Sequence, residues 1–289
     1  MELGGIQYIH HNSRSNQFRV WAVADIHLGN AGCNKERLME DIDSIASDPN
    51  SYWTGIGDFA DYIVPGDKRF DADCIPDDIK PRDMARYGHY IKHEVLKLFK
   101  PIKHKCLGLG FGNHEKSYFI GKNQEDIHTW LCQELEVPNF GYCAFYDVQF
   151  LRGKGGTSKL VRGGSPTGRN GAARCRKRFF QHHGAGHAVT PGGKLNKLLQ
   201  FMYGFGPADV YFIGHVHDQT VKRLDVLGAN DTCVAHKVHK RIGLITGGYL
   251  EAYTQGRTSY AERAGYLPTV LGSVYVVIDP ETGDMRASV

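Results

Sequence analysis

Aspartate, asparagine and histidine side chains recur along the chain in five short clusters whose residue types suit metal binding. The clusters are Asp25-Ile26-His27, Gly57-Asp58-Phe59-Ala60-Asp61, Gly112-Asn113-His114-Glu115, His182-His183-Gly184 and Gly214-His215-Val216-His217. Carboxylate oxygens, an amide carbonyl and imidazole nitrogens are suitable ligands for Mn²⁺, iron and Zn²⁺. On an extended segment alternate side chains point to the same side, so Asp25 and His27 can reach one cavity, as can His215 and His217.

A pair of metal ions would give these clusters a definite chemistry. Two cations about 3.5–4 Å apart neutralise the charge of a phosphate ester, orient its oxygens and lower the pKa of the water between them. Such a pair needs a bridging ligand with two oxygens, and Asp58 is the candidate. Each cluster alone has an ordinary explanation, such as a Gly-Asp turn or a lone surface histidine. The five together, in this order, favour a metal site.

The elements that must position the clusters are predicted to be buried strands. Short apolar runs precede the five clusters at residues 18–24, 52–56, 105–111, 178–181 and 210–213. Periodicity predicts helices at 35–47, 83–99, 124–136 and 194–202, and further strands at 144–151, 241–245 and 273–278. Alternating strands and helices indicate the α/β class. Ligand sites of α/β proteins lie at the carboxyl ends of the strands, so we expect the five clusters to converge.

The composition fits a globular protein without disulfides or membrane spans. The 289 residues are 41% hydrophobic, carry a net charge of +4 and suit one domain over residues 1–289. The seven cysteines are spread along the chain without a Cys-x-x-Cys pair, which predicts free thiols in a reducing compartment. No apolar run reaches the roughly 20 residues of a membrane span, and residues 1–5 lack a signal-peptide pattern. We therefore predict a cytoplasmic protein.

The five motifs together resemble the calcineurin-like metallophosphoesterase superfamily. The later segments 247–249, 259–262 and 268–272 also look like subfamilies of this group, many of them phage or bacterial. The family pattern is Asp-x-His, Gly-Asp-x-x-Asp, Gly-Asn-His-Glu, His and Gly-His-x-His, and all five parts occur here in order between residues 25 and 217. The resemblance implies a four-layer α-β-β-α sandwich that hydrolyses phosphate esters with two divalent transition metal ions. Mn²⁺ is the expected metal, and iron, Zn²⁺ and Ni²⁺ are the alternatives.

The resemblance also implies roles for individual residues. The ligands implied for the first metal are Asp25, His27, Asp58 and His217. Those implied for the second are Asp58, Asn113, His183 and His215, with His182 as the alternative to His183. His114 resembles the general acid of the family, which protonates the leaving oxygen or stabilises its charge. Asp25 is a candidate acceptor for a hydrogen bond from the attacking water, and Asp61 either orients a ligand histidine or is a plain surface residue.

A basic stretch before the fourth motif bears on the substrate. Residues 152–178 form a predicted Gly-rich loop insertion with nine lysine or arginine residues and no acidic residue. Flexible basic loops neutralise a nucleic-acid backbone without reading its bases. The candidate substrate contacts are therefore Arg174, Arg176, Lys177 and Arg178. The alternative is a solvated loop that balances acidic residues elsewhere in the chain.

These observations predict a phosphodiesterase or nuclease that acts on DNA or RNA. The alternative is a phosphodiesterase or phosphatase for nucleotides or other small phosphate esters. A non-catalytic scaffold is disfavoured because no predicted ligand is replaced. A Ser/Thr protein phosphatase is also disfavoured, because Tyr62-Ile63 follows Asp61 where that branch carries Arg-Gly. The sequence makes no prediction about oligomeric state.

Overall fold

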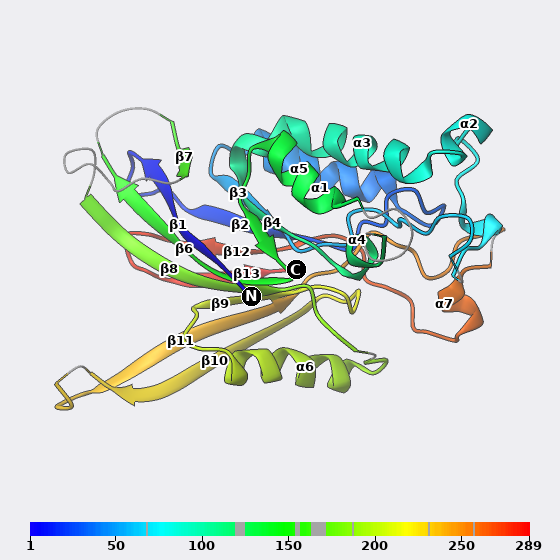
Figure 1. Cartoon of the computed structure of the whole chain (residues 1–289). Helices are drawn as coiled ribbons and strands as arrows, with labels where there is room; N and C mark the ends of the chain where they lie inside the picture. The colour runs from blue at the N-terminus through cyan, green and yellow to red at the C-terminus, as the bar shows by residue number, and fades with distance from the viewer. Residues whose placement is uncertain are drawn as a thin grey trace.

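The computed structural model of the chain describes residues 1–289 except 68, 119–124, 154–156, 163–171, 187, 231 and 257. Two β-sheets lie face to face, with helices on both outer sides (Figure 1). Helices, sheet, sheet and helix therefore follow one another, and the predicted four-layer α-β-β-α sandwich is confirmed. Among the described residues no helix has the length and apolar character that a membrane span requires.

The first sheet has six strands and positions three of the five clusters. Its order is β13 (Met285–Ser288), β12 (Val274–Ile278), β2 (Phe18–Val23), β3 (Ser51–Gly55), β4 (Cys106–Gly110) and β5 (Asn139–Gly141). Strands β2 to β5 run parallel, whereas β12 is antiparallel to β2 and to β13. Strands β3 and β4 are buried throughout, as expected of parallel strands covered on both faces. Their shared direction brings residues 25–27, 58–61 and 112–115 to one edge.

The second sheet has seven strands and positions the two histidine clusters. Its order is β10 (Thr220–Ala229), β11 (His236–Ile245), β9 (Val210–Ile213), β8 (Ala172–His182), β6 (Cys143–Arg152), β1 (Glu2–His11) and β7 (Lys159–Arg162). Strands β8 and β9 are parallel neighbours, so the residues that follow them lie side by side. On its other side, β9 pairs with β11, but only residues 242–245 of β11 take part. The rest of the β10–β11 hairpin extends beyond the sandwich (Figure 1).

Helices cover the outer face of each sheet (Figure 1). Helices α1 (Lys35–Ser47), α3 (Tyr87–Phe99) and α5 (Ile127–Leu135) pack on the six-stranded sheet, and α6 (Pro191–Gly204) packs on the seven-stranded sheet. The shorter helices are η1 (Ala72–Cys74), α2 (Pro81–Met84), η2 (Lys100–Lys105), α4 (Asn113–Tyr118) and α7 (Tyr260–Arg263). An aromatic core that includes Phe18, Phe150, Phe179 and Phe212 fills the space between the sheets.

Helix α1 shows how local sequence sets these elements. Asn34 caps the helix, because its side-chain oxygen accepts a hydrogen bond from the backbone amide of Arg37. Leu38, Ile42 and Ile45 recur at helical spacing and are buried against the sheet. The helix spans the predicted residues 35–47.

Several elements differ from the sequence-based expectation. The predicted helix at 83–99 is divided into α2 and α3. Strands β1, β10 and β13 were not predicted, because β1 contains Gly4-Gly5, β10 carries three charged residues and β13 is only four residues long. Strand β8 begins at Ala172 rather than at residue 178, and β7 interrupts the predicted loop at 152–178. Pairing with β6 supplies the hydrogen bonds that override the weak strand preference of this basic sequence.

Candidate metal centre

The five clusters converge where strands β2, β3, β4, β8 and β9 end. Three groups of side chains each offer ligand atoms that lie within 4.8 Å of one another. The groups are Asp25 with His27 and His217, His27 with Asp58 and His114, and Asp58 with His183 and His215. His27 and Asp58 each belong to two groups, so the three groups form one continuous cluster.

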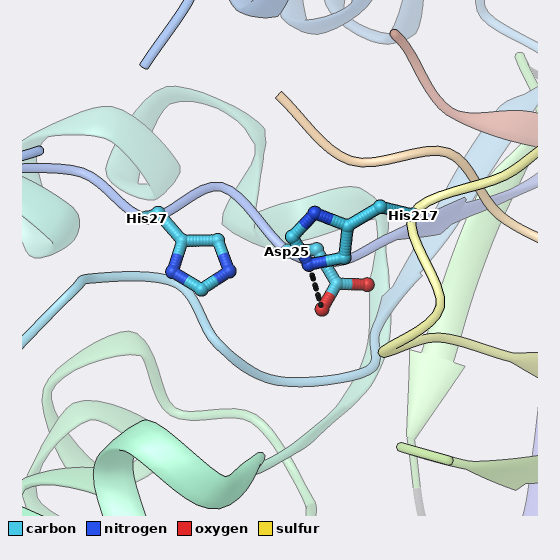
Figure 2. A group of neighbouring side chains, drawn as sticks. All are labelled: Asp25, His27 and His217. Carbon is cyan, nitrogen blue, oxygen red and sulfur yellow. Dashed lines mark ion pairs between the residues drawn. The ribbon is translucent and has the colours of Figure 1, made fainter. Parts of the chain in front are cut away.

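Asp25 forms an ion pair with His217, as Figure 2 shows. Its Oδ1 lies 3.4 Å from Nε2 of His217, which follows strand β9 of the other sheet. Its Oδ2 accepts a hydrogen bond of 2.8 Å from the backbone amide of His215. Asp25 is fully buried, so its carboxylate is held in place by the histidine segment that it faces.

His27 is oriented by a buried carboxylate. Its Nδ1 lies 3.2 Å from Oδ1 of Asp61, and Oδ2 of Asp61 accepts a 3.0 Å hydrogen bond from the side-chain amide of Asn30. An imidazole that donates from Nδ1 presents Nε2 as a lone-pair ligand. Asp61 is only 7% exposed, which excludes the alternative of a plain surface residue.

Asp58 and His183 form the centre of the other half of the cluster. Nε2 of His183 lies 3.2 Å from Oδ2 of Asp58 and 3.1 Å from Oδ1 of Asn113. Nδ1 of His183 lies 2.9 Å from the backbone oxygen of Ile56, which fixes the ring and its tautomer. Asp58 and His183 are both buried, and the structure brings Asn113 to the same point.

His182, the alternative to His183, lies outside the three ligand groups. Consecutive strand residues point to opposite faces, so His182 turns toward helix α6. Its ring centroid is 4.5 Å from that of Phe201 in α6, and its Nδ1 accepts a hydrogen bond of 2.8 Å from the amide of Gly184. The structure therefore brings His183 rather than His182 to the cluster.

His114 lies against His27 at the side of the cluster where Asp61 stands. Nδ1 of His114 contacts the backbone oxygen of Asp61 and lies 3.3 Å from its Oδ1. The rings of His114 and His27 meet edge to face, with centroids 4.7 Å apart. His114 is thus within reach of Asp58 and of any substrate held at the cluster.

The cluster contains buried atoms that a cation would satisfy. Oδ1 of Asp25 and Nε2 of His27 have no hydrogen-bond partner among the described residues. An unsatisfied buried polar group costs about 1–3 kcal/mol, so such atoms usually have a function. The neighbouring donors are carboxylate oxygens and imidazole nitrogens, a set that suits divalent transition metals. The residues present therefore fit divalent metal ions.

The carboxylates of the cluster are held in the charged form that metal binding needs. Burial by itself would raise the pKa of Asp25, but the adjacent His217 and His183 outweigh burial and lower that pKa. Burial also opposes ionisation of Asp58, yet His183 and His114 hold its pKa well below the ordinary value. Both carboxylates are thus ready to act as anionic ligands.

The pKa values of the histidines in the cluster are also set by burial and by neighbouring charges. Burial lowers the pKa of His27, and burial together with the nearby His183 lowers the pKa of His215. Burial also disfavours the charged form of His183, but Asp58 outweighs it and raises the pKa of His183 to about 9. Neutral His27 and His215 are ready as ligands, whereas a cation would take the place of a proton on His183.

The backbone is strained at five of the seven predicted ligands. Asp25, His27, Asp58, His215 and His217 have φ angles of 52°, 50°, 53°, 71° and 44°. This left-handed conformation costs residues other than glycine about 1–2 kcal/mol each. Such strain is typically kept where surrounding structure must aim functional groups at one point. Its concentration here marks the cluster as a functional site.

Glu115 braces the cluster, a role that the sequence did not reveal. Its carboxylate accepts backbone hydrogen bonds of 3.0 Å from Asp58, 2.8 Å from Phe59 and 2.9 Å from Gly112. It is 4% exposed and thereby joins the loops that follow β3 and β4. The available signal was its place directly after the predicted Asn113-His114 pair.

Three of the four predicted substrate contacts, Arg176, Lys177 and Arg178, lie away from the cluster. Arg176 and Arg178 both donate to the buried carboxylate of Asp147 on β6. His183 follows Arg178 by five residues, about 16 Å along an extended strand. Lys177 lines a groove with residues of β11 and β13. The side chain of Arg174 and residues 154–156 and 163–171 lie outside the described part of the insertion.

A cavity of about 260 Å³ adjoins the cluster. His215 and His217 form one wall, and the other lining residues come from positions 30–32, from 73–74, from the segment that leads into the first turn of α6 and from the segments around α7. Figure 1 shows α7 at the same end of the molecule as α4. The exposed surface of the lining is mostly apolar. A molecule bound at the cluster can therefore place part of its structure in this cavity.

An α-β-β-α sandwich with an Asp/His cluster at its strand ends is suited to a metal-dependent enzyme. A family model described as calcineurin-like phosphoesterase matches residues 18–219, which include all five clusters. The chain belongs to the calcineurin-like phosphoesterase family and is a metal-dependent phosphoester hydrolase.

Two solved structures illustrate the range of similar proteins. One is a conserved uncharacterized protein from Streptococcus pneumoniae TIGR4, described as a predicted phosphoesterase, with 11% identity, a TM-score of 0.31 and coverage of 91% of this chain and 84% of that one. The other is a metallophosphoesterase from Sphaerobacter thermophilus, with 14% identity, a TM-score of 0.36 and coverage of 93% and 87%. No curated protein matches the chain.

Proposed function

We propose that the chain is a dinuclear metal-dependent phosphodiesterase whose two metal ions share Asp58. The ligands proposed for the first ion are Asp25, His27, Asp58 and His217. Those proposed for the second are Asp58, Asn113, His183 and His215. The observation that carries this assignment is the membership of Asp58 in two groups of ligand atoms, each within 4.8 Å.

The protein residues would prepare the centre for the chemistry of its metals. Two divalent cations, for which we propose Mn²⁺, would when bound neutralise the phosphate charge and lower the pKa of a water molecule. Asp61 and the backbone oxygen of Ile56 hold the imidazoles of His27 and His183 with their Nε2 atoms toward the centre. Outer contacts of this kind raise metal affinity because they fix ring orientation and tautomer.

Two residues are proposed to handle protons. The oxygen of the attacking water bonds to phosphorus as the bond from phosphorus to the leaving oxygen breaks, in line with the attack. Asp25 is proposed to accept a hydrogen bond from this water, because its Oδ1 has no hydrogen-bond partner among the described residues. His114 is proposed to protonate the leaving oxygen, since its Nδ1 is held by the backbone of Asp61 and its Nε2 is then the proton donor.

The geometry favours a small phosphodiester as substrate over DNA or RNA. Arg176 and Arg178 are engaged by Asp147, and Lys177 lines a groove formed with β11 and β13. Nucleic acid, the other candidate, is supported by the nine basic residues among positions 152–178. A cytoplasmic location stays a prediction.

Replacement of Asp58 by asparagine tests the shared ligand. We expect Asp58→Asn to lower the hydrolysis rate by at least about 100-fold, since loss of residues that merely contact metal ligands already costs about 10–100-fold. The bound metal, measured by elemental analysis of the purified protein, should fall together with activity.

Asp43→Asn is the matched control, because Asp43 is exposed on α1, belongs to none of the three ligand groups and undergoes the same chemical change. The control should retain wild-type metal content and rate. Wild-type turnover and metal content in Asp58→Asn would rule out Asp58 as the shared ligand.

A further inference from the structure

The cavity of about 260 Å³ beside the cluster offers a place for part of the substrate. We propose that it binds the ester group that a phosphodiester retains after hydrolysis, and that this group is uncharged, mostly apolar and smaller than a drug-sized ligand. This inference rests on the proposed function, because it assumes that the phosphate lies at the cluster formed around Asp58.

The walls of the cavity connect it to the cluster. His215 and His217 line it and also contribute ligand atoms to two of the three groups. Val216 between them, Leu250, Leu267 and Ala188 supply apolar surface. A phosphate held by these histidines can therefore direct one substituent onto an apolar wall, where burial from water is favourable.

The position of His114 identifies which substituent this is. His114 does not line the cavity, although His215 and His217 do. In an in-line displacement the leaving oxygen lies opposite the attacking water, and His114 is proposed to protonate it. A substituent on the His215 side is therefore the ester group that stays on phosphorus. A phosphomonoester has no such group, so the cavity favours diesters.

The charges of the lining exclude a second phosphate. Asp73 and Glu251 contribute carboxylates to the wall, and Lys194 is the only lysine or arginine among the described lining residues. Nζ of Lys194 lies 3.4 Å from Oδ2 of Asp218, with the two side chains 13% and 17% exposed. This cation is already paired with Asp218, so the described lining offers no further lysine or arginine to a second phosphate, whereas an uncharged group needs none.

The size and polarity of the cavity narrow the occupant further. Pockets for drug-sized ligands measure about 300–1,000 Å³, so about 260 Å³ holds a smaller group. The hydroxyl oxygen of Thr254, a lining residue, is buried and has no hydrogen-bond partner among the described residues. It can form one hydrogen bond to a polar atom on an otherwise apolar group.

A pair of diesters with the same leaving group tests the inference. Methyl 4-nitrophenyl phosphate and phenyl 4-nitrophenyl phosphate both release 4-nitrophenolate, and they differ only in the retained group. With added Mn²⁺ we expect kcat/KM to be on the order of tenfold higher for the phenyl ester, as is typical for an added apolar group in a fitting pocket. A short oligodeoxythymidylate serves as the polynucleotide substrate.

Two substitutions should remove this preference while the rate on the methyl ester stays within about twofold of wild type. Ala188→Phe fills the cavity. Leu267→Ala removes part of the cavity wall, and because Leu267 is 52% exposed this change should cost little folding stability. The matched controls are Ala235→Phe in the turn of the β10–β11 hairpin and Leu227→Ala on β10, where the side chain is 68% exposed. Both controls should keep the wild-type preference.

The outcomes separate this inference from the proposed function. Equal rates on the two esters, or an unchanged preference in both cavity variants, would overturn the proposed role of the cavity. Mn²⁺-dependent turnover in the same experiments would still support the proposed phosphodiesterase function. Faster cleavage of the oligonucleotide than of the phenyl ester would assign a polynucleotide substrate instead. Calorimetric titration with methylphenylphosphinate and dimethylphosphinate, whose P–C bonds are not hydrolysed, measures binding without turnover. A preference for the phenyl compound without hydrolysis of any ester would overturn the function alone.

Discussion

At the scale of single residues, the centre depends on histidines whose two ring nitrogens have different partners. His27 and His183 each give one ring nitrogen to a fixed acceptor, the carboxylate of Asp61 or the backbone oxygen of Ile56. The second nitrogen of each then faces the cluster. Because the acceptors lie on the protein, the orientation of both rings is set before any metal binds.

Replacement of His114 by alanine separates proton donation from metal binding. We expect His114→Ala to keep its metal but to lose about 10²–10⁴-fold in rate on alkyl phosphodiesters, whose leaving groups need a proton. The rate on 4-nitrophenyl esters should change far less, because 4-nitrophenolate leaves without one. Parallel kinetics on the two ester types, with elemental analysis, measure both effects.

His239→Ala, at an exposed position of β11, provides the matched control and should behave like the wild type. If His114→Ala instead purified without metal, His114 would be a ligand, as its place within 4.8 Å of His27 and Asp58 also allows.

At the scale of elements, the centre is built from loops that follow parallel strands and are tied to one another. Gly57, with a φ of 104°, leaves no room for a side chain, since a Cβ there would lie 2.2 Å from the backbone nitrogen of Gly112. Glu115 then joins these same loops through three backbone hydrogen bonds. The close approach of the loops places Asp58 and Asn113 at one point.

Glu115→Gln should loosen this connection. The amide nitrogen of glutamine would oppose backbone donors now bonded to a carboxylate oxygen, which should destabilise the fold by about 1–3 kcal/mol. Because Asp58 would shift, hydrolysis should fall more than the loss of folded protein accounts for. Denaturant unfolding and the rate per folded molecule measure these effects, with the exposed Glu134→Gln as the control. Wild-type stability would show that Glu115 does not brace the loops.

The arginines of β8 should matter for stability rather than for hydrolysis. Arg176 and Arg178 are 51% and 43% exposed at their side chains, and both pair with Asp147, which is 7% exposed. Replacing both by glutamine leaves this buried carboxylate without a cation, at a cost of about 1–2 kcal/mol after allowance for solvent screening. Hydrolysis of small diesters should be unchanged.

The salt dependence of oligonucleotide binding checks the opposite interpretation. If Arg176 and Arg178 contacted a nucleic-acid backbone, their double replacement would reduce the slope of log affinity against log salt by about 2. We expect no change in this slope, because both guanidinium groups are engaged by Asp147 and lie away from the cluster.

At the scale of the whole molecule, the metal centre lies where the two sheets meet at one end of the sandwich. Asp25, which follows a strand of one sheet, accepts a hydrogen bond from the backbone amide of His215, which follows a strand of the other. The side chains of Asp58 and His183 form a second contact between the two sheets. The cluster thus carries buried charge at the junction of the two layers. Metal binding is expected to stabilise the sandwich as a whole.

Removal of metal should therefore lower the thermal stability. A ligand present at 100 times its Kd stabilises the folded state by about 2.7 kcal/mol. For a chain of this size that corresponds to a loss of about 5–10 °C in Tm on treatment with a chelator. Scanning calorimetry before and after chelation measures the shift, and re-addition of Mn²⁺ should restore it. Asp58→Asn should show a smaller shift, and an unchanged wild-type Tm would contradict a structural contribution of the metal.

Local sequence was sufficient for much of this architecture. Helix α1 and strand β9 occupy the predicted residues, because a side-chain cap and apolar periodicity are short-range signals. The convergence of the five clusters was also expected, since carboxyl ends of parallel strands share an edge. Strand β1 was missed, because its pairing partners β6 and β7 are distant in sequence and its own pattern is weak.

The sequence by itself determined the donor types, their order and the strand ends that carry them, because these depend on composition and on residues a few positions apart. Only the tertiary structure decided between His182 and His183, paired Arg176 and Arg178 with Asp147, and assembled a cavity beside His215 and His217. The physical reason is that strand facing, charge pairing and cavity walls depend on contacts between segments far apart in the chain. Short-range patterns contain no information about those contacts.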